Sequence, residues 1–321
     1  MPVPTTSSKV LPPGIYCPTV TFFQPTAEQE LDIDQHVKHM EFLAKSGIAG
    51  VVLQGSTAEA VALDDEERKT LIRVAKETFR GLGHNGAIIA GTVGAQSSRQ
   101  ALNLTTDAAE AGADFSLVLP PSYYPGAMTP DAIQTFYEEL ADAAPIPIII
   151  YSYPGVCSGI NMDTDLICRL ARHPNIAGVK HTDHDVGRIA PSFTILGGAT
   201  DYLLGALAVG GQGAITGMAN VAPRVCAKAF ELAQAGKQQE ALEFAGAIST
   251  AEWGMGKGAI LGTKYMIAWG NGYKGSAAIA RKPLPLVPEA TKEHVRSVGE
   301  EIVALERKLE AEGWAGAAIR A

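Results

Sequence analysis

The sequence predicts a (β/α)8 barrel with a C-terminal helical extension. Eight short apolar runs alternate with longer amphipathic segments, which is the order of elements in a parallel sheet. Most of the runs are almost continuously apolar, as in strands buried on both faces. The chain has 321 residues, which suits one barrel with extensions. An open doubly wound sheet is the main alternative, but no G-x-G-x-x-G follows the first run.

The apolar runs are expected to form the eight strands of the barrel. They cover residues 15–23, 50–54, 87–91, 115–119, 146–152, 176–180, 193–197 and 213–216. The segments between the first six are expected to be helices, over residues 34–46, 64–80, 98–111, 129–143 and 163–172. Local signals mark the helix ends: an acidic turn at residues 64–67, Pro130 at a first helical position, and Gly112 after a last turn.

Strand patterns stop after Pro223, and the rest of the chain is predicted to be mostly helical. Helices are expected over residues 224–236, 238–268 and 292–312. The segment 270–288 is rich in glycine and proline, which indicates a loop. The predicted organisation is a flexible N-terminal segment (residues 1–13), a barrel (14–223) and a C-terminal helical extension (224–321).

The composition argues against several classes of partner. The net charge is −8 and there is no basic block, so we expect no nucleic-acid binding. No apolar run reaches the roughly 18 residues that a membrane span needs, so we expect no membrane association. The four cysteines form no C-x-x-C pair, as expected of free thiols in a reducing compartment. The first 14 residues lack the pattern of a signal or transit peptide, and we expect a cytoplasmic protein.

Two polar residues that close apolar runs are the strongest catalytic candidates, because active sites of such barrels lie at the carboxyl ends of the strands. Lys180 closes the sixth run. Burial there would lower its pKa and make the amine a nucleophile, whereas the alternative is a lysine that reaches solvent. Tyr151 closes the fifth run and is a candidate proton relay, with a simple core aromatic as the alternative.

Four further strand ends offer groups for binding an anionic substrate. Segment 55–59 (GSTAE) brings small residues and the hydroxyls of Ser56 and Thr57; the alternative is an ordinary helix cap. Tyr123 and Tyr124 follow the fourth run and would line a pocket or form a subunit contact. The glycine-rich ends of the seventh and eighth runs would form a pocket wall.

A polar cluster after Lys180 is the feature that would suggest a metal-dependent lyase. It contains His181, Asp183, His184 and Asp185. All four lie in one loop, and no second segment is rich in metal ligands. We therefore predict no metal and no organic cofactor, and keep the metal-dependent lyase as an alternative.

Taken together, these motifs resemble the dihydrodipicolinate synthase/N-acetylneuraminate lyase family. Segment 55–59 matches the family's G-[ST]-T-G-E, Tyr151 falls in its Y-N-x-P segment, and residues 178–180 match its G-[IV]-K. The resemblance covers roughly residues 14–300, with the order and spacing of all eight units. It implies a barrel enzyme that forms a Schiff base with a 2-oxo acid and is a homotetramer, a dimer of dimers.

The resemblance also implies a role for each candidate residue. Lys180 would form the imine, and Tyr151 would relay protons. Ser56 and Thr57 would hold the substrate carboxylate, with Thr57 also hydrogen-bonding Tyr151. A neighbouring subunit would lend Tyr124, or alternatively Tyr123. Gly198 and Ile215 would line the pyruvate pocket.

Departures from the family pattern bear on the substrate. Val156 stands where dihydrodipicolinate synthases carry an arginine that binds a carboxylate, so that reaction is not expected here. Ala58 and Ser152 replace a glycine and an asparagine. The chain is similar to fungal-type 2-keto-3-deoxy acid aldolases, the branch that includes L-threo-3-deoxy-hexulosonate aldolase, and to 4-hydroxy-2-oxoglutarate aldolases. Hydroxyl partners for a sugar-acid tail would come from Ser152, Tyr153, Thr182 and Asp183.

A non-catalytic family member that serves as a binding protein is the remaining alternative. Such a protein would be free to lose its nucleophile and its relay. The presence of both Lys180 and Tyr151 argues against it.

Overall fold

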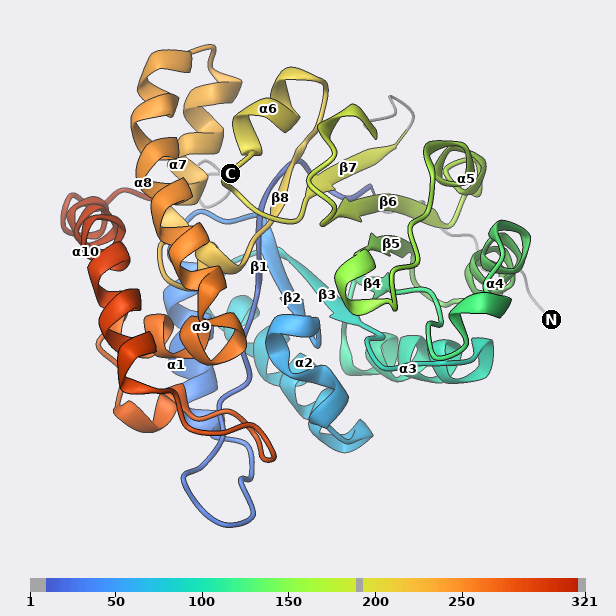
Figure 1. The fold of residues 1–321 in the computed structure, drawn as a ribbon, viewed down its shortest axis with the longest axis horizontal. Helices are drawn as coiled ribbons and strands as arrows, with labels where there is room; N and C mark the ends of the chain where they lie inside the picture. The colour runs from blue at the N-terminus through green and yellow to red at the C-terminus, as the bar shows by residue number, and fades with distance from the viewer. Residues whose placement is uncertain (1–9, 189–192, 317–321) are drawn as a thin grey trace.

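The chain forms a closed barrel of eight parallel strands in sequence order, as predicted. A computed structural model describes residues 10–188 and 193–316. The strands are β1 Gly14–Pro18, β2 Gly50–Leu53, β3 Ala87–Gly91, β4 Phe115–Val118, β5 Ile148–Ser152, β6 Ile176–His181, β7 Thr194–Gly197 and β8 Gly213–Ile215. Pairing of β1 with β8 closes the ring (Figure 1). The expected N-terminal segment 1–13 lies largely outside the described residues.

Helices follow the strands around the outside of the barrel. They are α1 Ile33–Ala44, α2 Asp65–Gly81, α3 Ser98–Ala111, α4 Pro130–Ala143, α5 Thr164–Leu170, α6 Leu203–Ala208 and α7 Pro223–Gln234. The capping signals in the sequence are confirmed: Asp64 and Glu67 form a reciprocal capping box, and Gly112 ends α3 in the left-handed conformation. The six-residue α6 was not predicted.

The first predicted strand is too long. β1 ends at Pro18, which pairs with Val52 one residue before β2 ends. The Thr19 N–H still donates to the Val52 carbonyl over 3.0 Å, and residues 20–23 then leave the barrel sheet while remaining buried. This buried, irregular segment brings Thr21 under the loop that follows β2.

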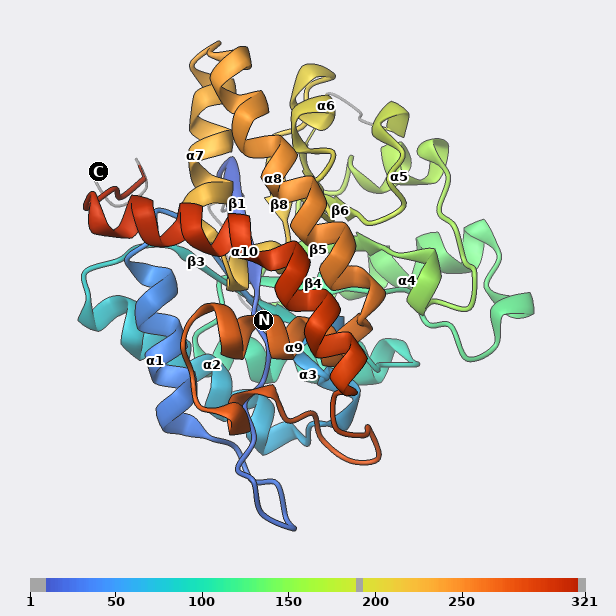
Figure 2. The same cartoon turned by 60° about the vertical axis from the view of Figure 1, so that its left-hand side comes forward.

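Three long helices follow α7 and pack on one side of the barrel. They are α8 Gln238–Lys257, α9 Ala259–Gly270 and α10 Glu289–Ala311. Figure 2 shows α10 crossing α8 and α9. The prediction of one continuous helix over residues 238–268 is wrong, because the helix breaks at Gly258. A Cβ there would lie 2.6 Å from Gly262 Cα and 3.0 Å from the Thr291 side chain, so the break depends on close packing against α10.

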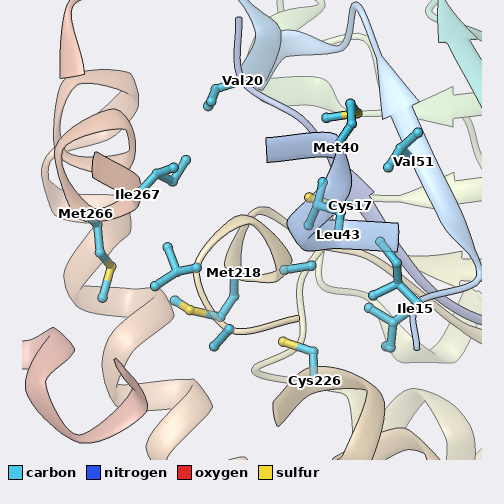
Figure 3. Close-up of a cluster of buried hydrophobic side chains, with 14 of the residues drawn as sticks. Ile15, Cys17, Val20, Met40, Leu43, Val51, Met218, Cys226, Met266 and Ile267 are labelled. Carbon is cyan, nitrogen blue, oxygen red and sulfur yellow. The ribbon is translucent and has the colours of Figure 1, made fainter. Parts of the chain in front are cut away.

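The barrel and the C-terminal helices share one hydrophobic core. Figure 3 shows Ile15 and Cys17 of β1 in the same cluster as Met40 of α1 and Met266 and Ile267 of α9. α7 also packs directly against β1. The helices after the barrel are therefore fixed to its wall by buried apolar contacts.

Strand alternation separates a lumen face from an outer face. Tyr16, Val52, Leu117, Ile149 and Ile215 come from five different strands yet form one buried cluster, and only the lumen can bring them together. Ile148 and Ile150 belong to a different cluster that packs against α4 and α5. In β5, residue 149 and residue 151 therefore face inward, and residues 148, 150 and 152 face outward.

Within the described residues, no helix is long and apolar enough to cross a membrane.

Candidate active site

Lys180 and Tyr151 meet at the carboxyl ends of two neighbouring strands. They are direct register partners on β6 and β5. The Lys180 amine donates a hydrogen bond to the Tyr151 hydroxyl over 3.1 Å, and its Nζ lies 4.2 Å from the centre of the tyrosine ring. Both side chains are buried, with 5% and 2% of their surface exposed. The structure thus brings together the two residues that the sequence singled out.

The surroundings of Lys180 favour a neutral amine. Burial lowers its pKa from 10.5 to about 7. Among the described residues, no carboxylate lies within ion-pair distance of Nζ to offset this loss of solvation. About half of the amines are then unprotonated at neutral pH, which is the form that attacks a carbonyl.

Tyr151 remains a phenol at neutral pH and can donate its proton. Burial raises its pKa to about 12, an effect that the hydroxyls of Ser56 and Thr182 partly offset. Ser56 Oγ and Thr182 Oγ1 are themselves buried, and neither makes a well-aligned hydrogen bond to another described group. The phenol therefore lies between two hydroxyls that are available to a substrate.

The structure places Ser56, not Thr57, beside the phenol, which corrects the predicted hydrogen bond between Thr57 and Tyr151. Residues Ser56–Ala58 form a 3-10 turn, η1. Successive side chains in such a turn point about 120° apart, so two adjacent hydroxyls cannot both face the same phenol. Thr57 is partly exposed.

Gly198 follows β7, the strand paired with β6, and has no room for a side chain. A Cβ at this position would lie 2.3 Å from Thr182 Oγ1 and 2.8 Å from the His181 carbonyl oxygen. The Gly198 N–H donates to Tyr202 Oη over 2.5 Å, and that hydroxyl donates to the His181 carbonyl over 2.6 Å. Ile215 lies in the lumen cluster with Tyr151. The ends of β6 and β7 are thereby locked together beside Lys180.

A carboxylate from α8 supports the same wall, and sequence reasoning did not find it. Glu252 accepts hydrogen bonds from the Thr200 N–H (2.8 Å), the Asp201 N–H (3.0 Å) and the hydroxyls of Thr200 (2.8 Å) and Thr216 (2.6 Å). Burial raises the pKa of Glu252, and the two hydroxyls oppose that rise. Glu252 thus connects the segments that follow β7 and β8.

Ser152 does not face the lumen, contrary to its predicted place among the substrate-binding residues. It follows Tyr151 in β5 and pairs in register with His181, so alternation directs it to the outer face. Tyr153 packs against Tyr151, with the ring centres 5.8 Å apart. Val156 is 42% exposed and provides no charge.

Tyr123 and Tyr124 lie outside the buried site of the barrel. They are 75% and 73% exposed, and their rings meet edge to face with centres 5.0 Å apart. A paired, exposed aromatic surface is typical of a protein interface. Neither tyrosine can be assigned to the lumen of its own barrel.

The polar cluster after Lys180 is held together by an arginine. Asp183 accepts from His181 Nδ1 (3.2 Å) and Arg188 Nη1 (3.3 Å), and Asp185 accepts from Arg188 Nε (3.1 Å). Burial works to raise the pKa of Asp183, but these donors hold it below its usual value. A guanidinium between two carboxylates disfavours a divalent cation there. In the described part of the chain, no three His, Cys, Asp or Glu side chains are grouped to hold a metal ion.

The chain is similar to known proteins along most of its length. Residues 12–301 match the dihydrodipicolinate synthetase family. A protein of Emericella nidulans named "Probable 4-hydroxy-2-oxoglutarate aldolase, mitochondrial" is 37% identical over 95% of this chain and 100% of its own. An L-threo-3-deoxy-hexylosonate aldolase of Aspergillus niger is 36% identical over 93% of this chain and 97% of its own.

A solved structure shows the same fold at similar identity. It is a dihydrodipicolinate synthase family protein from Coccidioides immitis, 38% identical, with a TM-score of 0.84 over 94% of this chain and 98% of that one. These matches span the barrel and most of the helices that follow it. The chain belongs to the dihydrodipicolinate synthetase family.

Proposed function

We propose that this protein is a class I aldolase that cleaves a 2-keto-3-deoxy sugar acid to pyruvate and an aldehyde through a Schiff base on Lys180. The observation that carries the proposal is the buried Lys180 amine, without a carboxylate partner among the described residues, 3.1 Å from the Tyr151 hydroxyl. Family membership and the aldolase names of relatives 36–37% identical support the reaction class.

The chemistry begins with the neutral amine of Lys180, which attacks the C2 carbonyl of the substrate. Tyr151 donates its proton to the carbinolamine hydroxyl, which leaves as water, and an iminium beside a phenoxide remains. The positive iminium stabilises the phenoxide of Tyr151, which would otherwise form only near pH 12, because burial raises the pKa of Tyr151 to about 12.

The phenoxide of Tyr151 then takes the proton of the C4 hydroxyl. The C3–C4 bond breaks, its electrons pass to the imine nitrogen, and an aldehyde leaves behind an enamine. Tyr151 returns the proton to C3, and water hydrolyses the resulting pyruvyl imine. Ser56 and Thr182, on either side of the phenol, would guide these transfers and orient the substrate. Ser56 and Thr57 would hold the carboxylate.

The choice of a sugar acid rests on the polar groups near the site. The buried Thr182 hydroxyl lies next to the phenol, makes no well-aligned hydrogen bond to a described group, and suits a substrate hydroxyl. A 4-hydroxy-2-oxoglutarate substrate would need a cation for its second carboxylate, and the nearby Arg188 is already engaged by Asp183 and Asp185. 4-Hydroxy-2-oxoglutarate, the substrate in the name of the Emericella nidulans relative, is the second candidate. The exposed Val156 argues against dihydrodipicolinate synthesis.

We also propose a homotetramer in which Tyr124 of each subunit completes a neighbour's relay, with Tyr123 as the alternative. The exposure of both rings supports this assembly. Light scattering should give a tetramer, and Tyr124→Phe should lower kcat without changing the assembly. For compartment we propose the cytoplasm. The name of the Emericella nidulans relative carries a mitochondrial label, so cell fractionation is the deciding measurement.

Borohydride trapping is the decisive experiment for the Schiff base. The protein would be incubated with pyruvate and sodium borohydride, digested with trypsin and analysed by mass spectrometry. A reduced pyruvyl adduct is expected on Lys180 and not on Lys257, an exposed lysine that serves as internal control. Lys180→Ala should abolish both adduct and turnover. Full activity after treatment would overturn the proposal.

Two further assays separate the alternatives. EDTA should leave the activity unchanged, whereas its loss would favour a metal-dependent lyase. Pyruvate release, followed through lactate dehydrogenase, should be faster from 2-keto-3-deoxy sugar acids than from 4-hydroxy-2-oxoglutarate. A folded protein that forms no adduct and releases no pyruvate would indicate a non-catalytic binding protein.

A further inference from the structure

A second lysine, Lys264 of α9, is buried far more completely than an ordinary lysine. Its side chain is fully enclosed, and its amine lies 4.7 Å from the centre of the Phe23 ring. Unlike Lys180, it has a carboxylate partner: Nζ lies 2.6 Å from Glu59 Oε1. It also donates to the Thr21 carbonyl over 2.8 Å. A buried and paired charge of this kind fixes the positions of the groups around it.

Glu59, the partner of Lys264, has a backbone conformation that is unusual for glutamate. With φ 55° and ψ 36° it is left-handed, and it joins the 3-10 turns η1 (Ser56–Ala58) and η2 (Ala60–Ala62). Side chains with a Cβ avoid this region unless surrounding contacts impose it. Both carboxylate oxygens are held by α9 and by the segment between α9 and α10. Lys264 binds Oε1, and the Arg281 N–H donates to Oε2 over 2.8 Å.

A second set of contacts ties the same turn to the chain after β1. Thr21 Oγ1 donates to the Ala58 carbonyl over 2.7 Å, while the Thr21 carbonyl accepts from Lys264. Lys264, Thr21, Ala58 and Glu59 therefore form a closed ring of contacts. This ring fixes the end of η1, the turn in which Ser56 lies two residues before Ala58.

We propose that Lys264 and Glu59 are positioning residues that hold η1 so that the Ser56 hydroxyl faces Tyr151. The inference rests on the proposed Schiff-base function, because it assigns the pair to proton transfer through Ser56. Neither residue touches the reacting atoms. Removing the amine of Lys264 leaves the Glu59 carboxylate held only through Oε2, by the Arg281 N–H. We expect the left-handed turn then to relax and Ser56 to move away from the phenol.

A double-mutant cycle tests whether Lys264 acts through Ser56. The variants are Ser56→Ala, Lys264→Met and the combination, with Lys257→Met as a control on an exposed lysine of α8. Each single variant is expected to lower kcat by about tenfold or more, and the control should not. If the effect of Lys264 passes through Ser56, adding Lys264→Met to Ser56→Ala should change kcat by less than about twofold.

A purely structural role for Lys264 would give a different result. Lys264→Met would then lower kcat by the same factor in both backgrounds, and this additivity would overturn the inference while leaving the Schiff base intact. A folded Lys264→Met variant with the kcat of the wild type would overturn it as well. The Tm of every variant is measured by thermal unfolding, and kcat is measured well below the lowest Tm. Differences in kcat then cannot come from unfolded protein.

Glu59→Gln provides the second route if Lys264→Met does not fold. It keeps the shape of the side chain and removes only its charge, and the same lack of additivity with Ser56→Ala is expected; additivity would overturn the inference. Failure of the proposed function looks different. No borohydride adduct on wild-type Lys180, or an unchanged kcat in Ser56→Ala, would remove the relay itself and this inference with it.

Discussion

Replacing Lys180 by methionine should abolish catalysis and make the protein more stable. The folded protein holds this lysine away from water, so its pKa falls from 10.5 to about 7. The unfolded chain solvates the same amine and binds its proton more tightly. Below pH 10.5 the lysine therefore favours the unfolded state, and the cost reaches its full value below pH 7, where the amine is protonated in both states.

The size of the effect follows from that pKa. One pKa unit corresponds to about 1.4 kcal/mol, so at pH 7 the buried lysine costs on the order of 4 kcal/mol. At pH 10 nearly all of the folded amines and about a quarter of the unfolded amines are neutral. The pH is then only about half a unit below the unfolded pKa, and the cost falls to roughly 1 kcal/mol. Methionine has nearly the same length, carries no charge and fills the same space.

Urea unfolding at pH 6, 7 and 10 is the assay, at one fixed protein concentration because the proposed assembly would contribute to stability. The free energy of unfolding of Lys180→Met should exceed that of the wild type at pH 6 and 7. This difference should become smaller at pH 10. The exposed Lys257→Met should show no such trend. A margin that does not vary with pH, or a Lys180→Met variant less stable than the wild type at pH 7, would refute the reasoning.

Three other predictions concern the same site. The rate of borohydride trapping should rise about tenfold per pH unit below pH 7 and level off above it, because only the neutral amine reacts; a rate that is flat from pH 5 to 8 would contradict the lowered pKa of Lys180. Gly198→Ala should lower kcat/KM by about tenfold or more, because the new Cβ would displace Thr182. Unchanged kcat/KM would show that the residues around Gly198 accommodate a Cβ without disturbing the site. Glu252→Ala removes the acceptor of four hydrogen bonds and should cost on the order of 3 kcal/mol in urea unfolding. The exposed Glu243→Ala is its control, and equal stability of the two variants would contradict the role given to this carboxylate.

The barrel and its two central residues could be predicted because their signals are local. Each buried parallel strand is an apolar run, and Lys180 and Tyr151 are polar residues at the ends of two such runs. Thr182 carries a similar signal, since it lies two residues after Lys180. By strand alternation it falls on the same face.

The features that sequence reasoning missed depend on contacts between distant segments. Whether Ser56 or Thr57 faces Tyr151 depends on the conformation of η1. Glu59, at the end of η1, has a left-handed conformation that no local sequence pattern predicts. Lys264 lies 205 residues from Glu59, and Glu252 lies 52 residues from Thr200. The outward direction of Ser152 follows only once the register of β5 is known.

The separation of Glu59 and Lys264 also orders events during protein synthesis. The ribosome makes the reactive Lys180 and its relay Tyr151 before it makes Lys264. Until α9 emerges, the Glu59 carboxylate has no amine to meet and the wall of β1 lacks part of its apolar cover. A chain whose last helices complete its core is exposed to misfolding while it is being made. Aldolase activity should therefore appear only after nearly the whole chain has left the ribosome.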